Sequence, residues 1–224
     1  MKLLVATGNK GKIKEIAHEV EAAGLHQRGL IVIGLAELQA TTGGQPFPDV
    51  VEDRPTFLGN ATKKARHNAA FSGMLTLADD SGLCVAALNG APGVYSARYA
   101  GEPCDNAANN AKLLNAMANI PDDQRQAKFV CAMALAAPPH PTALDLAAMI
   151  DEVHGEILHA PRGTHGFGYD PLFFHPVSNL TTAELPMAEK SKLSHRGKAL
   201  RRMIAWMQQH WEQLATLAGD THAP

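Results

Sequence analysis

The first third of the chain alternates short apolar runs with segments of helical periodicity. Apolar runs of strand length cover residues 2–7, 30–35 and 74–79. Between them, the pattern predicts one helix over residues 10–23 and another that begins at Thr56. The apolar faces of these two helices are formed by Ile13, Ile16, Ala17 and Val20 and by Phe57, Ala61, Ala65 and Ala69, with Lys63, Lys64 and Arg66 on the outer face of the second. Strands that alternate with helices predict an α/β fold.

The rest of the chain contains more consecutive strands. Strands are predicted at 128–136, 144–151 and 172–175, with 153–159 continuing the sheet and a Pro-rich turn at 138–141. Helices are predicted from Asp105 to about Ala118 and from near Ser194 toward the end of the chain, and loops at 41–55 and 161–171. Because the later strands follow one another directly, the sheet is predicted to be mixed.

Composition narrows the classes of protein that fit this pattern. The chain has 224 residues with 46% hydrophobic content, enough for one large domain or two closely packed lobes. Its formal net charge of -2 disfavours a nucleic acid polymer as the main partner, whereas a local Lys and Arg cluster suits a small anion. Three cysteines without metal-type spacing predict buried free thiols in a reducing compartment. We expect no signal peptide and no membrane span, and therefore a soluble cytoplasmic protein.

The stretch TGNKGK at 7–12 places glycines and lysines where the first strand leads into the first helix. Ligands of α/β sheets gather at the carboxyl ends of strands, and a helix that begins there offers N–H groups and a positive dipole end. Gly8 and Gly11 let the backbone approach a phosphate, and Lys10 and Lys12 add mobile charges. The stretch therefore indicates an anion site, although a plain turn with surface lysines fits the spacing equally well.

Three acidic residues are candidates for binding a metal or activating water. Asp79 and Asp80 are predicted just after a strand, and neighbouring strand residues point to opposite faces, so we expect only one of them to bind a metal or activate water. Glu52, in a loop, is a candidate second ligand of a divalent cation, since Mg²⁺ usually takes one or two protein carboxylates. The alternative for the two aspartates is an Asx-type turn that closes the strand.

Two further stretches combine aromatic or basic residues with glycine. The loop GTHGFGYDP at 163–171 can present Phe167 or Tyr169 to a flat ring, or can pack both aromatic side chains in the core. The stretch EKSKLSHRG at 189–197 has Ser194 as a natural helix N-cap. Its basic residues, with Lys198 just beyond, either contact phosphate and base oxygens or form a solvated helix face.

Taken together, these segments make the chain similar to the inosine triphosphate pyrophosphatase family, close to its bacterial branch that acts on dITP and XTP. The segments that carry the resemblance are TGNKGK at 7–12, TFLGNATKKAR at 56–66, ADDSGL at 78–83, GAPGVYSARYAG at 90–101, PDDQRQAKF at 121–129, GTHGFGYDP at 163–171 and EKSKLSHRG at 189–197. They occur in family order and span nearly the whole chain, so that jointly they are highly specific.

The resemblance implies an enzyme that hydrolyses ITP, dITP and XTP to the nucleoside monophosphate and pyrophosphate. It also implies a single domain over residues 1–224, with an elongated mixed sheet flanked by helices in two lobes and an active-site cleft between them. A Mg²⁺ cofactor and a homodimer are further implied features.

Roles follow from the resemblance motif by motif. Asp80 resembles the family's catalytic acidic residue and a metal ligand, and Glu52 resembles the second metal ligand. The residues that resemble substrate contacts are Thr7, Gly8, Asn9, Lys10, Gly11 and Lys12 for the triphosphate, Ser81 beside the catalytic residue, and Phe167, Gly168, Tyr169, Asp170, Lys190, His195 and Arg196 for base, sugar and phosphate.

One position departs from the family pattern. The family usually reads T-F-x-E-N-A, whereas this chain has Gly59 in place of the Glu. This difference keeps open a nucleotide-binding protein with weakened catalysis. A triphosphatase of the Maf type is another alternative, although the SHRG and FGYDP segments argue against it.

Overall fold

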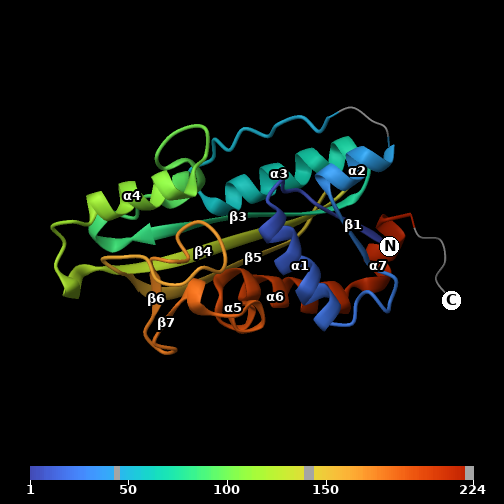
Figure 1. Cartoon of the computed structure of the whole chain (residues 1–224). Helices are drawn as coiled ribbons and strands as arrows, with labels where there is room; N and C mark the ends of the chain where they lie inside the picture. The colour runs from blue at the N-terminus through green and yellow to red at the C-terminus, as the bar shows by residue number, and fades with distance from the viewer. Residues whose placement is uncertain (43–45, 139–143, 220–224) are drawn as a thin grey trace. The chain divides into compact units, whose positions relative to one another are not determined.

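The computed structural model describes residues 1–42, 46–138 and 144–219 (Figure 1). The strands are β1 (Lys2–Val5), β2 (Ile31–Gly34), β3 (Leu75–Val85), β4 (Gln126–Ala137), β5 (Leu144–Ile157), β6 (Phe173–His175) and β7 (Leu180–Thr181). The helices are α1 (Lys10–Ala22), α2 (Leu35–Thr42), α3 (Phe57–Ser72), α4 (Asn106–Ala116), α5 (Met187–Leu193), α6 (His195–Gln209) and α7 (Trp211–Leu217).

The strands of the described residues form one mixed sheet in the order β2-β1-β3-β4-β5-β6-β7. β1 pairs in parallel with both β2 and β3, as strands connected through helices do. β6 pairs antiparallel with β5 and with β7. The predicted mixed α/β fold is therefore confirmed.

The chain divides into two compact units. The first contains Met1–Asp80, Ala132–Ile150 and Ala199–Pro224, and the second contains Ser81–Cys131 and Asp151–Lys198. Strands β3, β4 and β5 each contribute residues to both units, so neither unit is a single continuous stretch of the chain.

The first unit is built around a core rich in alanine. Figure 1 shows α3 on one side of the strands of this unit and α1 on the other. Ala61, Ala65 and Ala69 of α3 are fully buried, and they pack with alanines from β3 and β4. Thr56 caps the helix by accepting a hydrogen bond from the Gly59 N–H, as the predicted helix start requires. Small side chains on both surfaces let the helix lie close to the sheet.

The second unit has a core of larger side chains. Leu83, Val85, Leu113, Phe129 and Phe173 belong to one buried cluster, in which the two phenylalanine rings lie 4.5 Å apart between centroids. The predicted N-cap of its helix α4 is confirmed, because the Asp105 side chain accepts hydrogen bonds from the Ala107 and Ala108 N–H groups.

Several elements differ from the sequence prediction. Helices α2 and α5 and strand β7 were not predicted, and α2 runs into the first two residues of the predicted loop at 41–55. The prediction of a single long final helix is wrong, because α6 ends before His210 and α7 begins after it. Strand β3 continues well past 79, and β5 is one strand through the predicted break after 151. The Pro-rich turn predicted at 138–141 lies mostly outside the described residues.

Individual side chains also correct the prediction. Ala17 is exposed, although the periodicity placed it on the inner face of α1. Cys84, Cys104 and Cys131 are free thiols as expected, but Cys104 is exposed and Cys84 only half-buried. The expectation of three buried thiols is therefore wrong for two of them.

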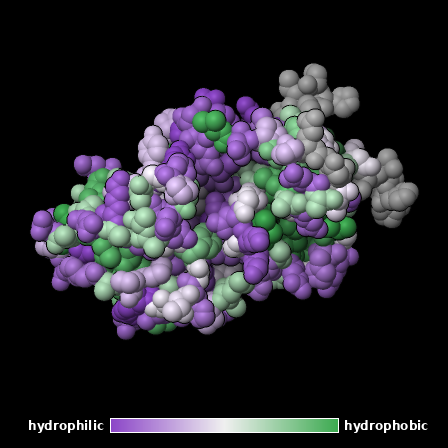
Figure 2. Space-filling view, turned by 45° about the horizontal axis from the view of Figure 1, so that its top comes forward, coloured by the Kyte–Doolittle hydropathy of each residue, from purple (hydrophilic) through white to green (hydrophobic). Residues whose placement is uncertain are grey.

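Some large apolar side chains are exposed, among them Val51, Tyr95 and Val177. On the face shown in Figure 2, hydrophobic residues lie between hydrophilic ones, which is ordinary for a protein surface. Within residues 1–42, 46–138 and 144–219, no helix is both long enough and apolar enough to cross a bilayer.

The close packing of α3 generates a stability prediction. Ala65→Leu adds volume to a fully buried position, so we expect it to lower the free energy of unfolding by about 1–3 kcal/mol. Ala70→Leu makes the same change at an exposed position of the same helix and should alter stability by less than about 0.5 kcal/mol. Urea denaturation followed by circular dichroism measures both. Equal stability of the two variants would contradict the alanine-packed interface.

Candidate active site

Two neighbouring aspartates of β3 have different partners. The Asp79 Oδ2 lies 2.9 Å from the Lys12 Nζ, whereas the Asp80 Oδ2 accepts a hydrogen bond of 3.0 Å from the Asn60 Nδ2. Both carboxylates are buried, and both lie inside the strand rather than after it. Their different partners are what we expect of adjacent strand residues, which face opposite sides of a sheet.

The stretch TGNKGK forms the first turn of α1 and the loop before it. Asn9 caps the helix, and its Oδ1 accepts hydrogen bonds from the N–H groups of Gly11 at 2.8 Å and Lys12 at 3.2 Å. The Thr7 hydroxyl accepts one from the Asn9 N–H. Lys10 is exposed, but the Lys12 side chain is only 15% exposed and is held by Asp79. In this structure the Lys12 ammonium therefore lies in an ion pair and is mostly covered.

Glu52 and Asp80 meet at one ammonium group. The Lys64 Nζ lies 3.1 Å from the Glu52 Oε1 and 3.9 Å from the Asp80 Oδ1. Lys64 was predicted on the outer face of its helix, but its side chain is only 12% exposed and turns toward these carboxylates. Burial raises the pKa of Asp80 above its usual value and the negative charge of Glu52 raises it further, while Lys64, Asn60 and Lys12 act in the opposite direction.

These two carboxylates are a donor set that suits a divalent cation. Mg²⁺ is typically bound through one or two protein carboxylates together with waters and phosphate oxygens. Among the described residues, no group of three or more His, Cys, Asp and Glu side chains could hold a metal on its own. Glu52 and Asp80 both lie near Lys64, and two protein carboxylates would leave the other coordination positions of such a cation to waters and phosphate oxygens.

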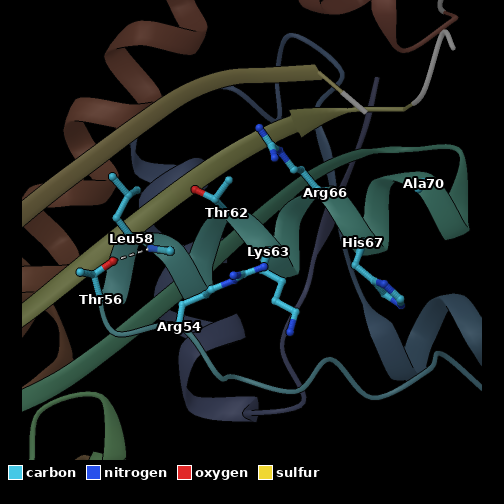
Figure 3. Close-up of a pocket in the computed structure, with 9 residues that line it drawn as sticks. Arg54, Thr56, Leu58, Thr62, Lys63, Arg66, His67 and Ala70 are labelled. Carbon is cyan, nitrogen blue, oxygen red and sulfur yellow. Dashed lines mark hydrogen bonds between the residues drawn. The ribbon is translucent and has the colours of Figure 1, made fainter. Parts of the chain in front are cut away.

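A hollow of about 870 Å³ runs along α3 (Figure 3). Its lining includes Arg54, Lys63 and Arg66. The first turn of the helix also lines it, and there the Thr56 hydroxyl accepts a hydrogen bond from the Gly59 N–H. Each of these cations already has a carboxylate partner. Arg54 and Lys63 lie 3.6 Å and 2.8 Å from the Asp53 Oδ1, and Arg66 forms a two-pronged pair with Asp145. All three cations of the hollow therefore lie in ion pairs.

In the second unit, Asp170 organises the glycine-rich loop. Its Oδ2 accepts hydrogen bonds from the Phe167 N–H at 2.9 Å and from the Lys190 Nζ at 2.7 Å. Gly166 has a positive φ of 77°, and a Cβ there would overlap the Asp170 carboxylate, so only glycine fits. The Lys190 ammonium and the Arg196 guanidinium lie 4.9 Å and 5.6 Å from the centroid of the Phe167 ring.

The basic residues of the stretch 189–198 divide into buried and exposed ones, and Lys198, like Lys192, is exposed. Lys190, His195 and Arg196 are buried, which contradicts a solvated helix face for these three, whereas Lys192 pairs with Glu189. The His195 ring is stacked on Phe129 at 4.7 Å. Ser194 caps α6 as predicted, since its hydroxyl accepts a hydrogen bond from the Gly197 N–H.

The two aromatic residues of the loop have different environments. Phe167 is partly exposed, whereas Tyr169 is buried in the core and its hydroxyl donates a hydrogen bond of 2.9 Å to the Ser96 carbonyl. Burial raises the pKa of Tyr169 above its usual value. The Gly168 carbonyl accepts a hydrogen bond from Asn110. The core-packing alternative therefore holds for the Tyr169 side chain, and Phe167 is the ring that a ligand can reach.

Sequence reasoning did not identify Asn60 and Lys64 as site residues. Both lie on α3 at the spacing of one helical turn, and they contact Asp80 from the same helix. Helical periodicity alone identifies which residues share a face, but not which carboxylates that face meets. Ser81, which follows Asp80 on β3, is half-buried.

Known proteins resemble this chain over most of its length. The model of the Ham1 family matches residues 3–206. A protein named dITP/XTP pyrophosphatase from Desulforamulus reducens is 48% identical over 204 residues, which cover 91% of this chain and 94% of the relative. A protein of the same name from Vibrio cholerae is 45% identical over 206 residues, with 91% and 94% covered.

Solved structures of Ham1 proteins are also similar to this chain. The structure of a HAM1 protein from Coxiella burnetii matches with a TM-score of 0.78 and 38% identity, covering 93% of this chain and 99% of that one. The Ham1 protein of Staphylococcus aureus matches with a TM-score of 0.77 and 36% identity, covering 94% and 100%. The order of motifs, the mixed sheet and these similarities lead to one assignment. This chain belongs to the Ham1 family.

Proposed function

We propose that this protein hydrolyses the non-standard purine nucleoside triphosphates dITP, ITP and XTP to the monophosphate and pyrophosphate. Its relatives from Desulforamulus reducens and Vibrio cholerae are named for this activity on dITP and XTP. The observation that carries the proposal is the meeting of Glu52 and Asp80 around Lys64. A binding protein without catalysis is not favoured, because both carboxylates are in place despite Gly59.

The cation proposed for this site is Mg²⁺, which Glu52 and Asp80 would hold. When bound, it would neutralise negative charge on the phosphate oxygens. Lys64 supports the site by offsetting the repulsion between the two carboxylates. This chain has Gly59 where the family usually has Glu, and Glu52 and Asp80 still lie near Lys64.

Asp80 is the proposed general base. The Asn60 side chain holds one of its oxygens, and the other faces Lys64. In the proposed step, Asp80 takes a proton from a water molecule, the water oxygen bonds to the α-phosphorus, and the bond from that phosphorus to the pyrophosphate oxygen breaks. Burial raises the pKa of Asp80, which makes its carboxylate a stronger base.

The triphosphate is proposed to lie against residues 7–12. The amide groups at the start of α1 and the ammonium of Lys12 favour negative charge there. Because Asp79 fixes the Lys12 side chain, the ammonium loses little freedom when a phosphate binds. Thr7, Gly8, Asn9, Lys10 and Gly11 complete this segment.

The purine base is proposed to bind in the second unit, against Phe167. A ring placed there has Lys190 and Arg196 nearby as donors for a 6-keto oxygen. The 6-amino group of adenine would leave such donors unsatisfied, which costs roughly 1–3 kcal/mol. Ser81, Gly168, Asp170 and His195 are proposed to complete the substrate contacts, and Tyr169 to act by fixing the loop through its buried side chain. Guanine must be rejected through its 2-amino group.

Assembly and location rest on the family resemblance. We propose a homodimer in the cytoplasm that acts on free nucleotides and binds neither nucleic acid polymers nor membranes. Light scattering of the purified protein tests the dimer directly.

The role of Asp80 predicts a specific loss. Asp80→Asn should lower kcat for dITP by roughly 10²–10⁴-fold, because the amide cannot accept a proton. Binding of dITP, followed by calorimetry, should persist. Pyrophosphate release across dITP, ITP, XTP and the standard triphosphates, with Mg²⁺ and with EDTA, measures turnover and its metal dependence. Near-normal hydrolysis by the variant, or undiminished turnover in EDTA, would contradict the mechanism.

The pairing of Lys12 with Asp79 predicts graded effects at the phosphate end. Lys12→Ala should raise KM and lower kcat for dITP, because a charge at the phosphates is lost. Asp79→Asn keeps the lysine but weakens its fixed position, so the same two constants should change in the same direction and by less. Steady-state kinetics on dITP measures both variants. No change in either variant would remove residues 7–12 from phosphate binding.

Base selection is testable at Lys190. Lys190→Met should narrow the ratio of kcat/KM for dITP to that for dATP by roughly 10–100-fold, because a donor to the 6-keto oxygen is lost. Lys192→Met removes an exposed lysine of the same helix and is the matched control. Competition between the two nucleotides gives the ratio directly. An unchanged ratio in the Lys190 variant would assign base selection to other groups.

A further inference from the structure

The segment that carries Glu52 lies directly on the first turn of α3. A Cβ added at Gly59 would meet the Arg54 Cβ at 2.9 Å and the Thr56 Oγ1 at 3.0 Å. Contacts this short do not occur without a shift of one partner. Gly59 has no positive φ, so the absence of a side chain provides space here rather than an unusual backbone conformation. The close approach of residues 54–56 to the helix therefore depends on glycine.

Asn60, the next residue, joins this segment to Asp80. Its side chain is fully buried, and both ends of the amide have partners. The Oδ1 accepts a hydrogen bond of 2.9 Å from the Arg54 N–H, and the Nδ2 donates one of 3.0 Å to the Asp80 Oδ2. These partners fix the orientation of the amide, because a backbone N–H can only donate and a carboxylate accepts.

This bridge bears on the distance between the two proposed metal ligands. Glu52 lies two residues before Arg54, in a segment that is neither helix nor strand. The segment is also held by Lys63, whose Nζ donates hydrogen bonds to the Val51 carbonyl and to Asp53. Two carboxylates near one another repel, so a geometry suited to a cation needs such constraints on both sides.

We propose that Asn60 is a positioning residue that holds the Glu52 segment against Asp80 and thereby sets the geometry for the divalent cation, and that Gly59 permits this arrangement. The inference rests on the proposed function, since it takes Glu52 and Asp80 as the metal ligands. A side chain at 59 would meet the Arg54 Cβ and the Thr56 hydroxyl, so one of these groups would have to shift, and Asn60 holds the backbone N–H of the same Arg54.

The experiment measures Mn²⁺ binding to the nucleotide-free protein by electron paramagnetic resonance. Asn60→Ala should weaken Mn²⁺ binding by tenfold or more and lower the melting temperature. Asn68→Ala is the matched control, because Asn68 is a buried asparagine of the same helix that bonds to the Lys64 carbonyl. It should lower the melting temperature while leaving Mn²⁺ affinity unchanged. Equal Mn²⁺ affinity of Asn60→Ala and the unmodified protein would overturn the proposal.

A second variant covers the case in which Asn60→Ala does not fold. Asn60→Leu keeps a side chain of similar size but removes both the acceptor for the Arg54 N–H and the donor to Asp80, so Mn²⁺ affinity should also fall. Gly59→Ala should weaken Mn²⁺ binding severalfold, although alanine ordinarily stabilises a helix relative to glycine. Unchanged affinity in Gly59→Ala together with a raised melting temperature would remove Gly59 from the proposal.

Two further variants separate this inference from the proposed function. Glu52→Gln and Asp80→Asn each remove a ligand charge and should weaken Mn²⁺ binding at least as strongly as Asn60→Ala. If neither does, the proposed metal site itself is wrong. If both do while Asn60→Ala and Asn60→Leu bind Mn²⁺ normally, the metal site stands and the positioning role of Asn60 is wrong.

Discussion

The repulsion between two buried or half-buried carboxylates is the constraint on which the first unit of this protein depends. Glu52 and Asp80 come from distant parts of the chain and meet at Lys64. Bringing them together costs free energy unless cations and hydrogen-bond donors compensate. Lys64 and Asn60, both on α3, supply that compensation, and the alanine face of the same helix fixes its distance from β3 and β4. Core packing and site geometry are thus determined by one helix.

Strand β3 also carries Asp79, the residue before Asp80. The Asp79 carboxylate pairs with Lys12 in the first turn of α1. In the second unit, Asp170 plays a comparable part by holding Lys190 and the backbone of Phe167. In each case a buried carboxylate orients a cation. A lysine that is already held can meet a phosphate or a keto oxygen with little further loss of conformational entropy.

Much of the fold follows from local patterns. The strands at 2–7 and 30–35 and the helix caps at Thr56, Asp105 and Ser194 are each determined by residues near one another in sequence. The order of strands and helices along the chain was enough to predict a mixed sheet. The sequence pattern did not predict the full length of β3, which continues through polar residues. Asp79 and Asp80 can lie inside this strand because they have partners on α1 and α3. The partners of Lys64, the burial of Tyr169 and the bridge through Asn60 join distant segments, which periodicity does not reveal.

The central claim is that Glu52 and Asp80 together bind the divalent cation of a Ham1-family pyrophosphatase. A crystal grown with Mn²⁺ and a non-hydrolysable dITP analogue tests it through anomalous scattering. The account predicts a peak in direct contact with a carboxylate oxygen of Glu52, one of Asp80 and a phosphate oxygen, at distances of about 2.0–2.3 Å. A fully occupied cation that contacts the phosphates but neither carboxylate would contradict it.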